Sequence, residues 1–354
     1  MRGDTLKILF ITNAPIEYSS SANIRNTSLI KGLLNNGEYV DILTSHPDRD
    51  SKYYDPTMVN MLGARIKYID KSYVRGTTAS KNNRLKSCEI YHKLRNYTYK
   101  IYGSFSIYDA RKRNQRFIDQ LTFDVHYDLV ISSSDPKSSH LIAEQIIDKY
   151  KIETWIQYWG DPLATDINKK SVIPRRILIN EELRLLRKAD ISVYVSPITL
   201  EIQKNLFSEV ASKLKYLPTP IGIDNNITNT ILETENVKMG YYGDYYSRDR
   251  NIIPLVNASR INRFALEIYG RSDINIETSK NISVNGRVSY EVIKKLEKNT
   301  DVLVCICNKK GGQIPGKIYH YASTNKPILL ILDGEYKDII RKNFKMHSNY
   351  FICD

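Results

Sequence analysis

The sequence predicts an α/β protein made of two similar halves, each built on a parallel β-sheet. Strand-sized apolar runs alternate with helix-length amphipathic segments along the chain, which is the pattern of βαβ units. The length of 354 residues exceeds what one hydrophobic core usually organises. The Pro-Thr-Pro-Ile-Gly run at 218–222 suits neither a helix nor a central strand, so it predicts a linker. We therefore expect an N-terminal domain over 1–217, a linker over 218–225 and a C-terminal domain over 226–354.

The individual elements follow from hydrophobic periodicity. The clearest helix spans 139–149, because Leu141, Ile142 and Ile146 fall on one face. The other expected elements are helices at 181–188, near 26, from about 252 and from about 315, and strands at 7–12, 40–44, 66–68, 129–132, 154–158, 191–195, 239–242, 265–269, 281–284, 302–307 and 328–332.

Composition favours a cytoplasmic enzyme without a metal. No apolar run approaches the ~18 residues needed to cross a bilayer. The run at 6–11 is expected to be a buried strand and not a signal peptide, because Asn13, Pro15 and Glu17 interrupt it. The four cysteines form no CxxC pair and have no histidine at metal-ligand spacing, so we expect reduced thiols and no metal site.

The net charge of +13 is concentrated in one segment. Residues 65–116 hold fourteen Lys or Arg and three acidic residues, a balance of +11, with tyrosines interleaved. Three interpretations fit. The segment can be a solvated helical face. It can bind an anionic membrane surface, where each cation adds on the order of 1 kcal/mol. It can also bind RNA or DNA.

The segment at 311–334 combines a Gly-Gly loop, a Pro-Gly-Lys helix start, a short helix and an apolar strand. Glycines let backbone N–H groups approach an anion, and a helix N-terminus aims unpaired N–H groups at the same place, which predicts a phosphate site. Lys317 adds a charge, and His320 lies one turn further on the same face, so both are expected to point at one ligand. The alternative is that the Gly-Gly and Pro-Gly pairs only shape a loop and bind nothing. The candidate residues are Gly311, Gly312, Pro315, Gly316, Lys317, His320 and Tyr321.

A second candidate group follows the strand expected at 239–242, because open α/β sheets bind ligands beyond the carboxyl ends of their strands. Gly243 opens a loop that contains two arginines. A guanidinium donates two hydrogen bonds at fixed geometry, which suits a diphosphate. Arg250 is the first choice for this contact and Arg248 the second, and the alternative is that both only decorate a loop.

The N-terminal half offers three further candidates at strand ends. Ser21 lies in a serine-rich stretch after the first strand and can donate to phosphate. Asp135 and Asp161 each precede a proline after a strand, and each can orient an acceptor hydroxyl. An Asp-Pro pair is also an ordinary turn former. His140 is expected to pack or to cap a helix.

These residues resemble the donor-sugar site of the retaining glycosyltransferases with a GT-B fold, the "group 1" (family 4-like) enzymes of bacterial surface polysaccharide biosynthesis. That family carries P-G-K-x-x-E-Y followed by G-K-P-x-L, where this chain has the matching letters at 315–317, 321 and 326–327. Its two glutamates, which have seven residues between them, are replaced here by Gly312 and His320.

The resemblance implies two Rossmann-like domains with parallel sheets facing a central cleft, the acceptor domain first and the donor domain second. It implies a retaining hexosyl- or other glycosyltransferase in which the departing diphosphate accepts the acceptor's proton. Arg250, Lys317, Asp161 and Asp135 are then the catalytic residues, while Ser21, Gly243, Arg248 and the candidates at 311–321 bind the donor. The family needs no metal and no cofactor, only a nucleotide sugar, with a UDP-sugar favoured and a GDP-sugar next.

The resemblance also favours a cytoplasmic enzyme that is peripheral at the inner membrane face. Its acceptor is expected to be a glycan or a lipid-linked sugar in capsule, O-antigen or exopolysaccharide synthesis. This favours an anionic membrane surface over nucleic acid as the partner of 65–116. The missing glutamates leave a second hypothesis, a non-catalytic sugar-nucleotide or glycan binding subunit on the same fold. Family members usually continue beyond the last strand with a further helix, so this form is expected to be short.

Overall fold

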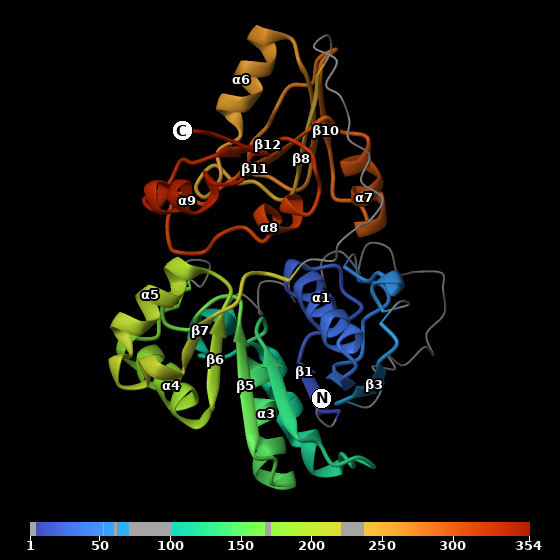
Figure 1. The fold of residues 1–354 in the computed structure, drawn as a ribbon, viewed down its shortest axis with the longest axis vertical. Coiled ribbons are helices and arrows are strands. Elements are labelled where there is room, and N and C mark those ends of the chain that lie inside the picture. The colour runs from blue at the N-terminus through green and yellow to red at the C-terminus, as the bar shows by residue number, and fades with distance from the viewer. Residues whose placement is uncertain (1–4, 52, 60–61, 71–100, 167–170, 221–236) are drawn as a thin grey trace. The chain divides into compact units, whose positions relative to one another are not determined.

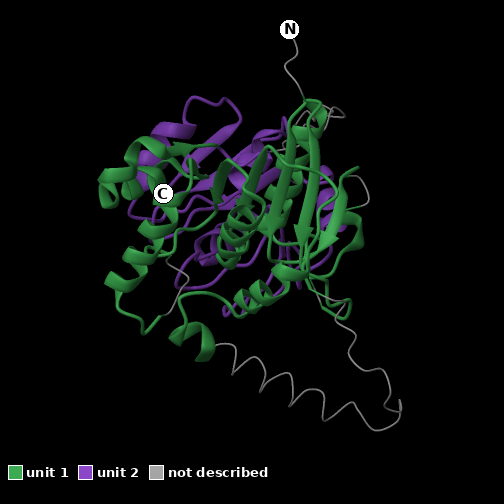
Figure 2. Ribbon diagram, turned by 90° about the horizontal axis from the view of Figure 1, so that it is seen from below, with its two compact units in different colours: residues 1–217 green, residues 218–354 purple. Residues whose placement is uncertain are grey.

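The computed structural model describes residues 5–51, 53–59, 62–70, 101–166, 171–220 and 237–354. The chain divides into two compact units, unit 1 over residues 1–217 and unit 2 over 218–354 (Figure 2). Each unit has its own all-parallel sheet, so the predicted α/β class with two parallel sheets is confirmed. Most of the basic segment, 71–100, and residues 221–225 of the expected linker lie outside the described residues.

Unit 1 is a doubly wound sheet of seven parallel strands (Figure 1). The chain order reverses between β1 and β4, which are neighbours in the sheet order β3-β2-β1-β4-β5-β6-β7. The three-residue strand β7 was not predicted, because only its first residue is buried. The strands are β1 (Lys7–Thr12), β2 (Tyr39–Thr44), β3 (Arg65–Tyr68), β4 (Leu129–Ser133), β5 (Thr154–Trp159), β6 (Ile191–Tyr194) and β7 (Leu214–Tyr216).

Helices cover both faces of this sheet. Alternate residues of a strand point to opposite faces, and the two cores of unit 1 share β1 in this way. Ile8 and Phe10 pack with Ile30 of α1 (Ser21–Asn35), while Leu9 and Ile11 belong to the core of α3. The helices in that second core are α3 (Ser138–Tyr150), α4 (Arg175–Lys188) and α5 (Pro197–Leu206), and the 3₁₀ segments of unit 1 are η1 (Pro56–Met58), η2 (Ala110–Gln120) and η3 (Ser208–Lys213).

Two predicted helix starts were too late. α1 begins at Ser21 and not near Asn26, because the Ser20 side chain caps it by accepting from the backbone N–H of Asn23. α4 begins at Arg175 and not at Glu181; the prediction missed Leu178, which is buried in the first turn on the same face as Leu185.

Unit 2 is a six-stranded parallel sheet with the order β10-β9-β8-β11-β12-β13. Leu255 and Val256 of α6 pack on Leu266 and Ile268 at one face, and α8 contacts β11 and β12. Its elements are β8 (Lys238–Tyr242), α6 (Ile253–Asn262), β9 (Ala265–Tyr269), β10 (Ile282–Asn285), α7 (Tyr290–Lys298), β11 (Val302–Ile306), α8 (Lys317–Ala322), β12 (Ile328–Ile331), α9 (Lys337–Phe344) and β13 (Tyr350–Cys353).

Two searches of the described residues returned nothing. No helix among them has both the length and the apolar character required to span a bilayer. Within the same residues, no cluster of three or more His, Cys, Asp or Glu side chains is arranged to hold a metal ion.

Candidate functional site

The carboxyl edge of the unit 2 sheet brings together residues from consecutive loops, and several of them are basic. Gly243 follows β8, Arg271 follows β9, Arg287 follows β10 and Asn308 follows β11. Lys317 opens α8, the next helix. All of these strands are parallel, so their ends meet at one edge.

Lys317 lies against the glycine turn after β8. A Cβ atom at position 243 would stand 3.1 Å from the Lys317 Nζ, so glycine gives the amino group its place. Burial is the main cause that lowers the pKa of Lys317 to about 8; the positive charge of Arg250 acts in the same direction, and the Glu297 carboxylate opposes it. An anion bound beside Lys317 would reverse this shift, because it favours the charged amine.

The Arg250 guanidinium is held in a fixed position at the same edge. Its Nε donates to the Oδ1 of Asn308 at 2.7 Å, and its Nη1 donates to the carbonyl of Asp244 at 3.4 Å. Asn308 was not predicted, although it directly follows the β11 end and the strand-end rule applies to it. Arg248, the second choice, is exposed and pairs with its neighbour Asp249 at 3.0 Å.

Asp244 ties the loops of this edge together. Its Oδ1 accepts from the backbone N–H of Arg271 at 3.0 Å, and its Oδ2 accepts from Arg287 at 3.0 Å. The loops are in close backbone contact, because a Cβ on Gly270 would stand 2.0 Å from the Gly243 carbonyl oxygen. Gly270 also has a φ of +152°, which side-chain-bearing residues rarely adopt.

The Gly-Gly loop differs from the expected open phosphate cradle. Gly311 has the positive φ of +77° that glycine allows, but its backbone N–H already donates to the Glu335 carboxylate at 2.8 Å. Gly312 is buried in the same loop. The helix after Pro315 and Gly316 has six residues, so its dipole is shorter than a regular helix would supply. Lys317 therefore carries more of the predicted anion attraction than the loop does.

His320 and Tyr321 make contacts that the helical spacing did not predict. The His320 Nε2 lies 3.4 Å from the Oε2 of Glu297, a buried carboxylate of α7. Glu297 thus orients the His320 ring. Tyr321 is fully buried, and its hydroxyl has no hydrogen-bond partner within the described part of the chain.

The carboxyl edge of unit 1 carries carboxylates around a buried lysine. Lys137 donates to Asp135 at 2.6 Å and to Asp166 at 2.8 Å. Asp135 follows β4 and Asp161 follows β5, as the sequence predicted. Lys137 and Asp166 were not predicted, because their role depends on contacts between different loops.

The two aspartates of this cluster have opposite pKa shifts. Burial tends to raise the pKa of Asp135, but the charge and hydrogen bond of Lys137 outweigh it, so the pKa is lowered. Burial and the neighbouring Asp135 charge raise the pKa of Asp161 to about 7. Asp135 therefore stays ionised at neutral pH, while Asp161 exchanges a proton there.

Arg25 of α1 is a second buried cation near this cluster, and its charge acts on both Asp135 and Asp161. It is buried, its guanidinium lies 5.0 Å from the centre of the Tyr158 ring, and it donates to the Ser134 carbonyl. A Cβ on Gly160 would come within 2.4 Å of the Arg25 Nη1, so any larger residue at 160 would force the guanidinium to move. The glycine before Asp161 is the sequence signal that points to this close approach.

Glu182 of α4 fixes the loop that carries Asp161. Its Oε2 accepts from the backbone N–H groups of Leu163 at 3.1 Å and Ala164 at 2.8 Å. Ser21 and His140 contribute less. Ser21 is the exposed first residue of α1 and not a loop residue. His140 is fully buried beside Trp159, as expected of a packing histidine, and burial lowers its pKa to about 3.

A second polar group at this edge was also not predicted. His46 follows β2 and its Nδ1 lies 3.2 Å from Asp70, which follows β3. The His46 ring stacks on Tyr68 with 4.1 Å between ring centres, and the Tyr68 hydroxyl donates to Glu17 at 2.6 Å.

Comparisons with known proteins place the fold. No family model matches the chain, and no curated protein matches its sequence. Solved structures match instead. The apo form of the lipopolysaccharide outer core galactosyltransferase WaaB aligns over 97% of this chain and 89% of its own, with a TM-score of 0.54 and 14% identity. An α-glucosyltransferase in complex with UDP and a 13-mer DNA containing a HMU base aligns over 92% and 80%, with a TM-score of 0.54 and 7% identity.

A third match is the glycotransferase of kitacinnamycin, which aligns over 99% of this chain and 86% of its own, with a TM-score of 0.50 and 11% identity. At these identities the likeness establishes the fold. The protein has the GT-B fold, as the sequence predicted.

Proposed function

We propose that the protein is a glycosyltransferase that moves a sugar from a nucleotide-sugar donor to a glycan or lipid-linked acceptor with retention. The observation that carries the proposal is the pairing of Lys317 and Arg250 at the carboxyl edge of the unit 2 sheet. Lys317 lies against the glycine turn after β8, and Arg250 donates to the carbonyl of Asp244, the next residue of that turn, so two positive charges meet at one turn. A donor diphosphate would relieve this repulsion between like charges and receive charged hydrogen bonds from both.

The proposed reaction needs no strong base from the protein. The bond from the anomeric carbon to the diphosphate oxygen breaks, and the acceptor oxygen bonds the same face of that carbon. The acceptor's proton passes to the departing diphosphate. The protein then has two tasks, stabilising the charge that develops on the diphosphate and positioning the acceptor hydroxyl. Lys317 and Arg250 perform the first.

The second task falls to the carboxylates of unit 1. Asp135 is ionised and held by Lys137, so it is a fixed acceptor for a hydroxyl proton. Asp161, with a pKa of about 7, can accept or donate a hydrogen bond near neutral pH. We assign these two side chains to acceptor binding, and the donor to unit 2.

The donor is proposed to be a UDP-sugar, with a GDP-sugar next. UDP is the nucleotide present in the DNA-bound α-glucosyltransferase structure. The proposed role is in bacterial surface polysaccharide synthesis at the cytoplasmic face of the membrane. The lipopolysaccharide galactosyltransferase named above supports that role by its fold.

Two other functions remain as outcomes of the tests. Gly312 and His320 replace the family's glutamates, which favours a binding subunit that holds a sugar nucleotide without transferring the sugar. The α-glucosyltransferase solved with DNA shows that the GT-B fold can take a nucleic-acid acceptor, and the net charge of +13 would suit one.

Thermal unfolding against UDP, GDP, CMP, ADP and dTDP tests the donor site. A ligand present at 100 times its dissociation constant stabilises the folded state by about 2.7 kcal/mol. We expect one nucleotide to raise the melting temperature and Lys317→Ala to abolish the effect. Turnover of the matching radiolabelled nucleotide sugar then separates a transferase from a binding subunit. No shift with any nucleotide would contradict the proposal.

A further inference from the structure

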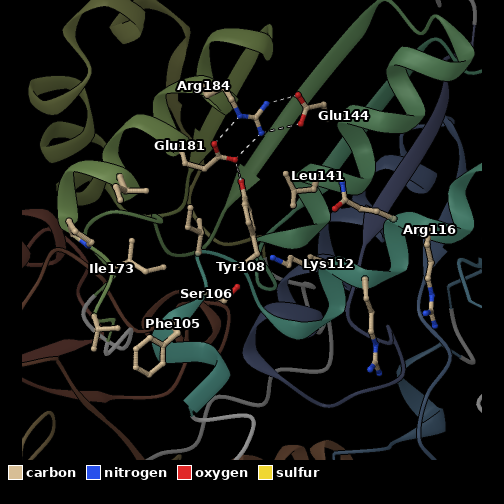
Figure 3. Close-up of a pocket in the computed structure, with 16 residues that line it drawn as sticks. Phe105, Ser106, Tyr108, Lys112, Arg116, Leu141, Glu144, Ile173, Glu181 and Arg184 are labelled. Carbon is tan, nitrogen blue, oxygen red and sulfur yellow. Dashed lines mark hydrogen bonds and ion pairs between the residues drawn. The ribbon is translucent and has the colours of Figure 1, made fainter.

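Unit 1 has a concave surface that no residue of the carboxylate cluster lines. It is an open groove of about 1390 Å³ formed by residues 105–108, the 3₁₀ segment η2, the N-terminal half of α3, and α4 up to Arg184 with the residues before it (Figure 3). Part of the basic segment singled out in the sequence, 105–116, lines it. The proposed transferase chemistry gives this groove no role.

One wall of the groove carries two carboxylates, Glu144 and Glu181, which are balanced by two cations, Arg184 and Lys188. Arg184 pairs with Glu144 at 2.6 Å and with Glu181 at 2.9 Å. The Tyr108 hydroxyl donates to Glu181 at 2.7 Å, as the dashed lines in Figure 3 show. Both carboxylates are therefore already compensated, and they do not repel an anion at the rim.

The rim of the groove exposes large apolar side chains. Phe105 is 70% exposed, Val172 is 60% exposed and Ile177 is 46% exposed. Ile101 and Tyr102, in the preceding helical turn, are also exposed. Single exposed apolar residues are common, but a group of them on neighbouring segments indicates a surface that another body covers.

Five exposed cations lie on the same segments as these apolar side chains or on adjoining ones, and two of them, Lys112 and Arg116, also lie over the rings of Tyr102 and Phe117. Arg113 and Arg116 stand three residues apart in η2, so the three-residue turn of a 3₁₀-helix puts them on one side. Lys112 is adjacent. Arg175 and Arg176 occupy the first turn of α4, which contains no acidic residue. Positive charge at a helix N-terminus opposes the helix dipole, so these two arginines weaken the helix that carries them.

We propose that this surface docks on an anionic lipid bilayer, with Phe105, Val172 and Ile177 entering the headgroup region and the five cations contacting lipid phosphates. The proposal rests on the membrane location given under the proposed function and names the surface responsible. Lipid phosphate complements the cations, and the acyl boundary complements the apolar side chains.

The same chemistry argues against the other occupants. A second copy of the chain would bring five cations against five, which is repulsive. Nucleic acid would satisfy the cations and could stack a base on Phe105, but Val172 and Ile177 have no π-face and would stay exposed.

The test is co-sedimentation of the full-length protein with vesicles of phosphatidylcholine alone or mixed with phosphatidylglycerol. We expect binding only to the mixed vesicles. Arg113→Gln combined with Arg116→Gln should weaken it about 25-fold, because each cation near an anionic leaflet contributes about fivefold. Phe105→Ser combined with Val172→Ser should weaken it about tenfold through lost apolar burial.

Matched controls carry the same changes elsewhere. Lys342→Gln with Lys345→Gln removes two exposed cations of unit 2, and Ile261→Ser with Met346→Ser removes two apolar side chains that are at least as exposed as the groove pair. Both controls should bind vesicles within about twofold of the wild type, since none of their residues belongs to the proposed surface.

Three results would overturn the proposal. One is equal vesicle binding by the groove variants and their controls. The second is salt-sensitive binding to an oligonucleotide but not to the mixed vesicles. The third is a dimer in light scattering that the groove variants dissociate. The nucleotide-induced rise in melting temperature is measured on every variant. If the wild type binds vesicles but no nucleotide, the docking surface stands and the transferase proposal falls.

Discussion

The carboxyl edges of the two sheets are built from the same parallel topology but carry opposite chemistry. In unit 2 the edge presents Lys317 and a fixed Arg250, and the pKa of the lysine is lowered. In unit 1 the edge presents Asp135 and Asp161 around a buried cation, Lys137. We propose that the positive charges suit the first edge to an anion, and that the carboxylates suit the second to hydroxyl groups. The topology sets where a ligand binds, and the loop residues set which ligand it is.

The largest expected effect is the loss of stability on replacing Lys137, the buried cation of unit 1. Lys137→Met leaves Asp135 and Asp166 near each other without their shared partner. We expect the free energy of unfolding to fall by about 3 to 5 kcal/mol, as in other broken buried ion pairs. Urea denaturation measures it.

A double variant sharpens this result. Adding Asp166→Asn to Lys137→Met removes one of the orphaned charges and should restore part of the loss. If Lys137→Met alone unfolds as readily as the wild type, the unit 1 carboxylates are not held by Lys137.

The next effect concerns the donor edge of unit 2. Lys317→Ala should weaken binding of the favoured nucleoside diphosphate by about 1.5 to 3 kcal/mol, the worth of a charged hydrogen bond. Lys317→Met should lose the same affinity and yet unfold at a higher temperature, because it removes an amine whose charge burial disfavours. A Lys317→Met protein that keeps full affinity would show that Lys317 does not contact phosphate.

Asp161 gives a smaller effect, on the pH dependence of stability. Its pKa is raised to about 7 in the folded chain, above the value of about 3.9 for an unfolded aspartate. The folded state therefore binds the extra proton between those values, and the contribution is lost as pH rises through 7. Asp161→Asn should stabilise the protein by about 1 to 2 kcal/mol at pH 8 and have little effect at pH 4. Chemical denaturation at both pH values checks this, and equal effects at both would contradict the raised pKa.

The smallest effect is expected at His320. His320→Glu restores the residue that the glycosyltransferase family carries, and it should leave nucleotide affinity within about 0.5 kcal/mol of the wild type. Repulsion from the neighbouring Glu297 limits how well this variant is tolerated, since two carboxylates would then stand close together. Loss of nucleotide binding would mean that the pairing of His320 with Glu297 serves the donor site directly. Isothermal titration of both proteins measures the difference.

Hydrophobic periodicity predicted the fold well, because a short continuous apolar run such as 302–307 is stable only as a buried element, here a strand. It failed at helix starts, because α1 opens with polar residues after its Ser20 cap and α4 opens with the exposed Arg175 and Arg176 after Pro174. The sequence indicated single strand-end residues such as Arg250. It did not indicate their partners, because Asn308 lies 58 residues further along the chain. The Glu335 carboxylate on the Gly311 N–H is a contact of the same kind.

The donor site of unit 2 is the central claim, and calorimetric titration of UDP and GDP at pH 8 tests it most directly. Buffers with different ionisation enthalpies report protons exchanged on binding. Because Lys317 has a pKa of about 8 in the free protein, a bound diphosphate should raise that pKa and draw in about half a proton per site. The predicted result is binding with proton uptake that Lys317→Met abolishes, with affinity falling as pH rises above 8. Binding that is equal in Lys317→Met, or no binding of any nucleoside diphosphate, would contradict the account.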